Sequence, residues 1–197
     1  MSGLKQLLYD DLSRQYELEG KSDTRPSFVG FIARLLHYRF LPNVICRTSR
    51  AAYLAGVPVV PNLFTYLNVL MFGLEVTPRC EIGPGVFFAH TYGTVVGGSR
   101  IGSRATFFQG VTIGAKTLEM RFDPALRPTV GDNVVLGAGC KVLGAIHLGD
   151  GVTVGANAVV LDSVEPGVTV VGVPARVVGL GELSGSSREV GQEVEPK

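Results

Sequence analysis

A six-residue repeat runs through this 197-residue chain from Val76 to Val160. Aliphatic or aromatic residues recur every six positions, with one extra residue before Val95 and an irregular insertion after Ile113. Hexapeptide periodicity is typical of a parallel β-helix, in which three six-residue strands form one coil and the coils stack about 4.8 Å apart. The repeat therefore predicts a mainly β fold. Its positions are Val76, Ile82, Phe88, Val95, Ile101, Phe107, Ile113, Val130, Leu136, Val142, Leu148, Val154 and Val160.

The repeat also gives the cysteines a role. One aliphatic side chain per strand points into the helix, and a smaller one four residues later completes the layer. This second inward position holds Cys80, Ala105, Cys140 and Ala158. We therefore interpret Cys80 and Cys140 as packing residues. With three cysteines and no CxxC pair, the chain shows neither a disulfide framework nor a thiolate metal site.

The N-terminal part has a helical pattern instead. Leu4, Leu7, Leu8 and Leu12 share one helical face, with Ser2 as the expected N-cap, and a second helix starts at Phe28 and is ended by Pro42. Two shorter helices are expected over 43–54 and 62–72. We predict an N-terminal helical cap or oligomerisation domain over 1–73, a β-helix over 74–180 with a loop extruded at 118–129, and a flexible tail over 181–197.

Charge and hydropathy exclude several classes of protein. With 18 Lys and Arg against 17 Asp and Glu, the chain lacks the basic excess that nucleic-acid binding needs. Its longest apolar stretch, 57–74, contains two prolines, and its N-terminus is too acidic for a signal peptide. We expect a cytoplasmic protein. Weak attachment to the inner face of a membrane is an alternative, suggested by arginines among aromatic residues at Arg34, Arg39, Arg47 and Arg50.

One of the three histidines stands out by its position in the repeat. We interpret His37 and His147 as structural or surface residues. His90 is third in its six-residue unit, and the third residues of the coils above it are Gln109, Ala138 and Ala156. These four residues should form a column along one edge, with His90 and Gln109 about 5 Å apart. A column with polar residues at its lower end and small side chains above them forms a groove that suits a long, thin ligand.

Four blocks of sequence carry a resemblance to a known family. EVTPRCEIGPGVFFAHTYGTVVG, FFQGVTIGAK, VGDNVVLGAGCKVLG and VVGVPARVVG resemble the serine acetyltransferase branch of the hexapeptide acyltransferases, over about residues 68–180. The similarity is strongest to members that acetylate sugars of exopolysaccharides and capsules, the colanic acid type. It implies a left-handed β-helix, a homotrimer with sites between subunits, and acetyl-coenzyme A as donor without a metal. Whether trimers pair into hexamers stays open.

The resemblance assigns roles to individual positions. His90 matches the catalytic histidine, a general base that takes the proton of the acceptor hydroxyl. Glu75 matches the acidic residue that orients this histidine, where serine acetyltransferases have Asp. The residues expected to bind the coenzyme are Gln109, Ala115, Lys116, Ala138, Ala156 and Arg176.

Two departures from serine acetyltransferases favour a different acceptor. Ala89 replaces an acid before the histidine, and Leu126 and Arg127 replace an Arg-His pair in the extruded loop. In that family these groups bind the amino and carboxyl groups of serine. We therefore predict an O-acetyltransferase acting on a saccharide, with Arg127 binding the acceptor. The alternatives are a serine O-acetyltransferase of cysteine biosynthesis and, from another class, a non-catalytic β-helix scaffold.

Overall fold

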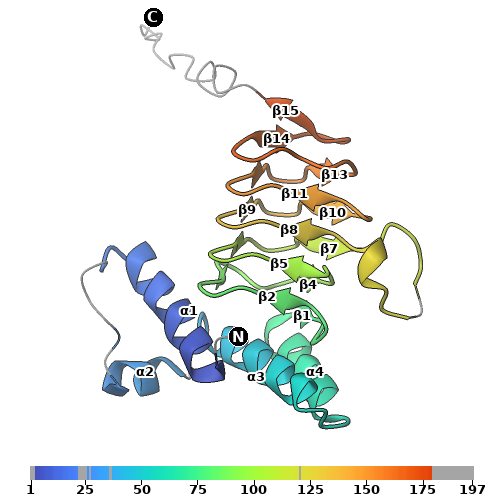
Figure 1. Ribbon diagram of the computed structural model, residues 1–197. Helices are drawn as coiled ribbons and strands as arrows, with labels where there is room; N and C mark the ends of the chain where they lie inside the picture. Colours follow the sequence, from blue (N-terminus) through green and yellow to red (C-terminus); the bar gives the residue numbers. More distant parts are fainter. Residues whose placement is uncertain (1–2, 22–25, 27, 36, 120, 179–197) are drawn as a thin grey trace, which may run out of the picture.

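Four helices pack beside one end of a stack of short strands (Figure 1). The computed structural model describes residues 3–21, 26, 28–35, 37–119 and 121–178. The predicted tail, 181–197, lies outside the described residues. The helices are α1 Leu4–Leu18, α2 Phe28–Leu35, α3 Leu41–Leu54 and α4 Val60–Phe72.

The strands form three sheets, one for each side of the β-helix. Neighbouring coils pair in parallel, and the last strand, β15, returns antiparallel to β14. One sheet contains β1 Leu74–Val76, β4 Thr94–Val96, β7 Thr112–Gly114, β10 Lys141–Leu143 and β13 Val159–Val160. The second contains β2 Glu81–Ile82, β5 Arg100–Ile101, β8 Thr129–Val130 and β11 His147–Leu148. The third contains β3 Phe87–Phe88, β6 Thr106–Phe107, β9 Val135–Leu136, β12 Thr153–Val154, β14 Thr169–Val171 and β15 Arg176–Val178.

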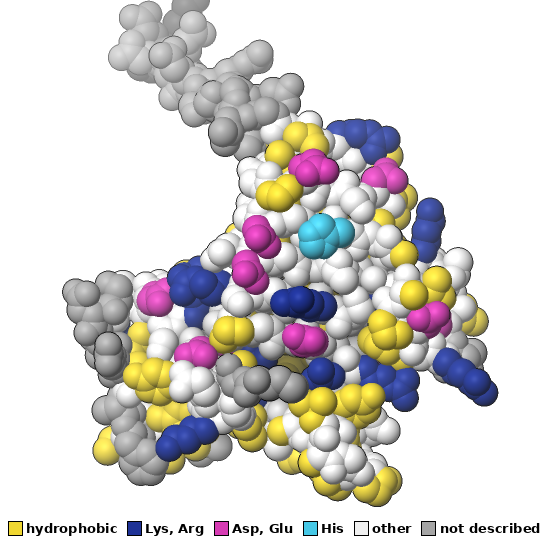
Figure 2. All heavy atoms as spheres, in the orientation of Figure 1, with side chains coloured by type: hydrophobic (Ala, Val, Ile, Leu, Met, Phe, Trp, Pro, Cys, Tyr) yellow, Lys and Arg dark blue, Asp and Glu magenta, His cyan; other side chains and the backbone are white. Residues whose placement is uncertain are grey.

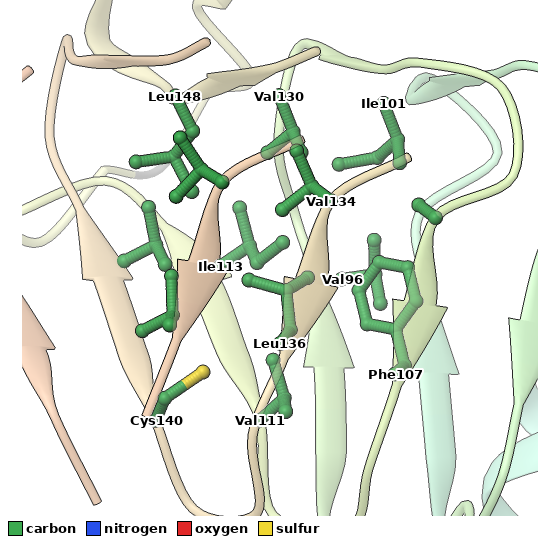
Figure 3. Close-up of a cluster of buried hydrophobic side chains, with 14 of the residues drawn as sticks. Val96, Ile101, Phe107, Val111, Ile113, Val130, Val134, Leu136, Cys140 and Leu148 are labelled. Atoms are coloured by element: carbon green, nitrogen blue, oxygen red, sulfur yellow. The ribbon is translucent and has the colours of Figure 1, made fainter. Parts of the chain in front are cut away.

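The core of the β-helix follows the six-residue repeat closely. Most of the predicted inward residues are buried, and Figure 3 shows several of them pointing into the interior from successive strands. The second inward position is also confirmed, because its four residues are at most 2% exposed: Cys80, Ala105, Cys140 and Ala158. Each strand of a coil therefore contributes a large side chain and a second inward side chain to the same layer.

The predicted register is wrong in one place. Val96, not Val95, faces the core and pairs with Ile113, whereas Val95 is half-buried (Figure 3). Phe88 keeps the register by pairing with Phe107. The corner between Phe88 and Val96 therefore contains two residues more than the six-residue period allows, and His90 lies within it.

Glycine follows many inward residues because adjacent coils approach closely there. A Cβ atom added to Gly131 would lie 2.3 Å from Asp150 Oδ1 and 2.8 Å from the Asp150 nitrogen. At Gly137 the same atom would lie 2.6 Å from the Val154 carbonyl oxygen. A larger residue at either position would push two coils apart.

A buried polar network joins the helices to the β-helix. Arg47 of α3 donates two hydrogen bonds to Asp11 of α1, and two more, at 2.6 Å each, to the carbonyl oxygens of Ile82 and Gly83. Asn43 also donates to Asp11, which accepts a further bond from the Val86 nitrogen. Burial raises the pKa of Asp11, and the neighbouring Arg47 and Asn43 oppose that rise.

Two expectations for the helix ends need correction. Pro42 does not end the second helix: α2 ends at Leu35, and Pro42 lies in the first turn of α3. A proline is well tolerated there because the first N–H groups of a helix have no partner within it. Ser2 lies outside the described residues, and Gly3 occupies the N-cap position of α1.

Three of the four arginines suggested for membrane attachment form contacts within the fold instead. Arg47 is buried in the polar network, Arg34 forms two hydrogen bonds with Glu19, and Arg50 donates to the carbonyl oxygens of Pro78 and Arg79. The membrane interpretation is therefore not supported. Within the described ranges, no helix has the length and apolar character to cross a bilayer.

Candidate functional site

His90 lies in an open hollow between the helices and the β-helix. The hollow has a volume of about 360 Å³, and the His90 side chain is exposed to solvent. Helix α1 supplies one wall with Gln15, Leu18 and Glu19, and Arg39 lies beside them. The strands supply the other wall with Phe87, Ala89, Thr106 and Phe108.

The two-residue insertion places His90 in this hollow. In the coils above, the Gly139 nitrogen donates to the Gln109 carbonyl, and the Asn157 nitrogen donates to the Ala138 carbonyl. Below them the Gly110 nitrogen donates to Tyr92, not to His90. Tyr92 therefore occupies the base of the predicted column, and the expectation that His90 would be its lowest member is wrong.

The corner that carries His90 is held in a defined shape. Thr94 is fully buried, and its hydroxyl donates to the Phe108 carbonyl at 3.2 Å. Its backbone nitrogen bonds to the Thr91 carbonyl at 3.1 Å, which closes the turn after His90. Tyr92, at the tip of this turn, is 81% exposed. The repeat did not single out Tyr92, although the extra residue before Val95 marks this corner.

The three upper residues of the column lie above one another along one edge of the β-helix, as the repeat predicts. Gln109 and Ala156 are exposed and Ala138 is half-buried, and each precedes a residue in the left-handed region. These following residues are Gly110, Gly139 and Asn157, with φ between 57° and 73°. The edge of the β-helix therefore offers a strip of small side chains above a glutamine.

Glu75 does not bond to His90 within this chain. It lies exposed in the middle of β1, in register with Val95 of β4. Among the described residues its carboxylate forms neither a hydrogen bond nor an ion pair, and the same holds for the His90 ring. Orientation of His90 by Glu75 stays a prediction.

The remaining predicted coenzyme-binding residues lie farther up the β-helix. Ala115 and Lys116 follow β7, and Lys116 is exposed beside Gly144 of the next coil. Arg176 opens β15, the last strand, and donates to the backbone of Ala175. Both cationic side chains are exposed to solvent.

Arg127, predicted to bind the acceptor, is engaged within its own loop. Its Nη1 donates to the Gly97 carbonyl at 2.7 Å, and its Nη2 bonds to Glu119 at 2.6 Å. Phe122 lies 4.2 Å from its guanidinium carbon. These contacts tie the extruded loop, which contains the short helix η1 Pro124–Leu126, back to the coil. Acceptor binding by Arg127 stays untested.

The other two histidines each form a hydrogen bond within the structure. His147 exchanges a 2.9 Å hydrogen bond with Thr129, and His37 accepts one from the Arg39 nitrogen and packs on Tyr38. In the part of the chain that the structure describes, no three His, Cys, Asp or Glu side chains are grouped so as to hold a metal ion.

Known proteins resemble this chain in both sequence and structure. The family model "Bacterial transferase hexapeptide (six repeats)" matches residues 127–162. The serine acetyltransferase of Helicobacter pylori is 36% identical over 169 residues, which are 85% of this chain and 97% of that protein. This chain belongs to the serine acetyltransferase family.

Further relatives of this family agree in sequence and fold. The serine acetyltransferase of Synechococcus elongatus is 39% identical over 146 residues, 73% of this chain and 59% of that protein. A serine acetyltransferase in complex with CoA matches with a TM-score of 0.75 and 26% identity, over 89% of this chain and 69% of that one. The Neisseria gonorrhoeae enzyme in complex with serine matches with a TM-score of 0.72 and 28% identity, over 88% and 68%.

These matches confirm the predicted fold, a left-handed β-helix with an N-terminal helical region. The coverage of the longer relatives is partial. This chain spans 59% of the length of the Synechococcus protein and 53% of the length of the Synechocystis protein. The assignment to the family therefore comes from the Helicobacter relative, which it spans almost fully.

The predicted saccharide acceptor is contradicted by the same relatives. All of the relatives compared are serine acetyltransferases, so the expected closeness to polysaccharide acetyltransferases is not supported. The prediction assumed that an acceptor amino acid must be held at the positions of Ala89 and Arg127. The hollow beside His90 is also lined by residues of α1 and by Arg39, which that prediction did not consider.

Proposed function

We propose that this protein transfers the acetyl group of acetyl-coenzyme A to the hydroxyl of L-serine. The observation that carries the proposal is the 36% identity to a serine acetyltransferase over 97% of that protein's length. The exposed His90 in its hollow supports it, since acyl transfer to an alcohol needs a base within reach of both substrates.

His90 acts as the general base in this proposal. Its ring takes the proton of the serine hydroxyl while the oxygen attacks the thioester carbonyl carbon. The carbon–sulfur bond then breaks, and the departing thiolate recovers the proton from His90, so that O-acetylserine and coenzyme A leave. General-base assistance of this kind contributes about 10² to 10⁴ in rate.

The coenzyme is proposed to lie along the column of small side chains. Ala138 and Ala156 leave the edge free of bulk, so an extended pantetheine arm fits against it, and Gln109 at its lower end lies near the thioester. The exposed Lys116 and Arg176 are suited to the negatively charged phosphates of the coenzyme.

The proposal includes a homotrimer with sites between subunits. Glu75 is exposed on the flat face of β1, where it is available to accept the ring N–H of a His90 and so fix its tautomer. A carboxylate in this role would stabilise the imidazolium formed during the reaction.

Release of free thiol from acetyl-coenzyme A tests the acceptor directly. The purified full chain is incubated with acetyl-coenzyme A and, in parallel, L-serine, D-serine, glucose or no acceptor. We expect thiol release that depends on L-serine, with O-acetylserine as the product by mass spectrometry. Release no faster with L-serine than without acceptor would overturn the proposal.

A further inference from the structure

The hollow beside His90 contains two polar groups that lack partners. Gln15 is 2% exposed, and its Oε1 has no hydrogen-bond partner. The Nε of Arg39 is likewise buried without a partner. Buried polar atoms are normally paired, so these two atoms are open to a hydrogen bond from a molecule that enters the hollow.

The two groups are held next to each other. Gln15 Nε2 donates to the Arg39 carbonyl at 2.8 Å, which orients the amide so that Oε1, an acceptor, is the free end. The Arg39 guanidinium packs 5.4 Å from the Tyr38 ring and, within the described residues, forms no ion pair. Gln15 and Arg39 both line the hollow, and each carries a polar atom that has no partner within the protein.

The other charged groups near the hollow are already engaged. The Glu19 carboxylate binds Arg34 through both oxygens and also contacts Lys21, and the pKa of Glu19 is lowered, chiefly by the hydrogen bonds from Arg34. Arg127, the residue first assigned to the acceptor, has both terminal nitrogens bonded within its loop.

We infer that Gln15 and Arg39 bind the α-amino acid end of the acceptor, with Gln15 Oε1 accepting from the ammonium group and Arg39 donating to the carboxylate. An α-amino acid zwitterion carries a donor and an anionic acceptor on one carbon, as the two unpaired groups require. Its side-chain hydroxyl then faces His90 across the hollow. This inference rests on the proposed function and names the residues that give it specificity for serine.

Acceptor analogues separate this role from a structural one. L-Serinamide lacks the carboxylate, and 3-hydroxypropionate lacks the ammonium group, yet both keep the hydroxyl. We measure kcat/KM for all three acceptors in the wild type and in Arg39→Gln, Arg39→Lys and Gln15→Leu. Arg100→Gln, an exposed arginine on β5 in another sheet, is the matched control.

Arg39→Gln is expected to lower kcat/KM for L-serine by about 10- to 100-fold, as loss of a charge-assisted hydrogen bond predicts. L-Serinamide should stay within about twofold, so the preference for serine collapses. Arg39→Lys should recover part of the loss. Gln15→Leu should erase the preference for serine over 3-hydroxypropionate, and the KM for acetyl-coenzyme A should not change.

Equal losses for serine and serinamide in Arg39→Gln, or no loss for either, would overturn the inference. This variant keeps the test decisive even where Gln15→Leu unfolds, since Arg39 is half-exposed. If the wild type acetylates serine and the variants keep the wild-type acceptor preferences, the proposed function holds but Gln15 and Arg39 do not bind the acceptor. Wild-type protein inactive toward serine overturns both.

Discussion

The helical region and the β-helix are stabilised in different ways. The β-helix buries one large and one small apolar side chain per strand, repeated from coil to coil. The helices are joined to it by a buried polar network around Asp11 and Arg47. Their far side stays apolar and exposed, at Leu63, Tyr66 and Leu70 of α4, and Figure 2 shows hydrophobic side chains gathered at this end. A repeated core can therefore be read from sequence, whereas a polar junction cannot.

This difference matters for function because the hollow lies where the two regions meet. The β-helix contributes His90 and the column of small side chains. Helix α1 and the segment before α3 contribute Gln15 and Arg39. Under the proposed function, the β-helix would supply the catalytic base and the coenzyme site, and the helical region would supply recognition of the acceptor.

Thiol reactivity should be suppressed in both regions, and most strongly at Cys80 and Cys140, which are buried, whereas Cys46 is partly exposed. Burial raises the pKa of Cys46 in α3, and of Cys80 and Cys140 in the β-helix, to about 12 in each case. Since the thiolate is the reactive form, the native thiols at pH 8 should react about a thousand times more slowly than in denaturant. Labelling followed by mass spectrometry measures this. Labelling of Cys80 or Cys140 as fast as in denaturant would contradict their place in the core of the β-helix.

Removing the arginine of the junction should destabilise the protein strongly. Arg47→Met removes the cationic partner of the Asp11 carboxylate, which keeps only its bonds from Asn43 and Val86, and it removes the donors to the carbonyl oxygens of Ile82 and Gly83. Loss of one partner of a buried ion pair costs about 3–5 kcal/mol of unfolding free energy. Urea denaturation followed by circular dichroism measures the loss.

The matched control for this change removes both charges. Asp11→Leu combined with Arg47→Met leaves no uncompensated charge, so it should be markedly more stable than Arg47→Met alone. A single variant as stable as the wild type would mean that the polar network does not hold the two regions together.

Truncation in the β-helix core should have a slightly smaller effect. Leu136 of β9 is fully buried among side chains from neighbouring coils. Leu136→Ala removes these contacts and leaves a cavity, with an expected loss of about 2–5 kcal/mol. The same substitution at the exposed Leu118 should cost less than about 0.5 kcal/mol, and denaturant midpoints compare the two. Similar costs at both sites would contradict the assigned core.

The surface ion pair between the two regions should contribute little. Glu17 of α1 bonds to Arg104 of the β-helix at 2.7 Å, and the Arg104 hydrogen bond is the main reason why the pKa of Glu17 is lowered. Glu17→Gln should cost less than about 1 kcal/mol. Because the folded pKa is lowered, this difference should be present at pH 7 and lost as pH falls through the lowered value. A cost that persists at pH 2 would be inconsistent with an ion pair.

The repeat predicted the β-helix core well because its signal is local and regular. It failed between Phe88 and Val96, where two extra residues fit into a corner without disturbing the coils on either side. The repeat shows that residues are inserted at this corner, but it does not show how these residues are arranged. For this reason Tyr92, and not His90, lies at the base of the column, and His90 lies in the hollow.

The helical contribution to the site was beyond the reach of the sequence pattern. Gln15 and Arg39 are 24 residues apart and meet through one side chain to backbone hydrogen bond. Arg47 resembled a surface residue in sequence, yet its partners lie 35 and 36 positions away. Such long-range polar contacts follow from the way that the helices pack on the first coils, which no local periodicity reveals.

The rate of thiol release by His90→Ala tests the central claim most directly. If His90 is the base, kcat with L-serine and acetyl-coenzyme A should fall by about 10² to 10⁴, while the KM for acetyl-coenzyme A changes little. The thermal midpoint should match that of the wild type, because the His90 side chain is exposed. A kcat within about threefold of the wild-type value would contradict the account.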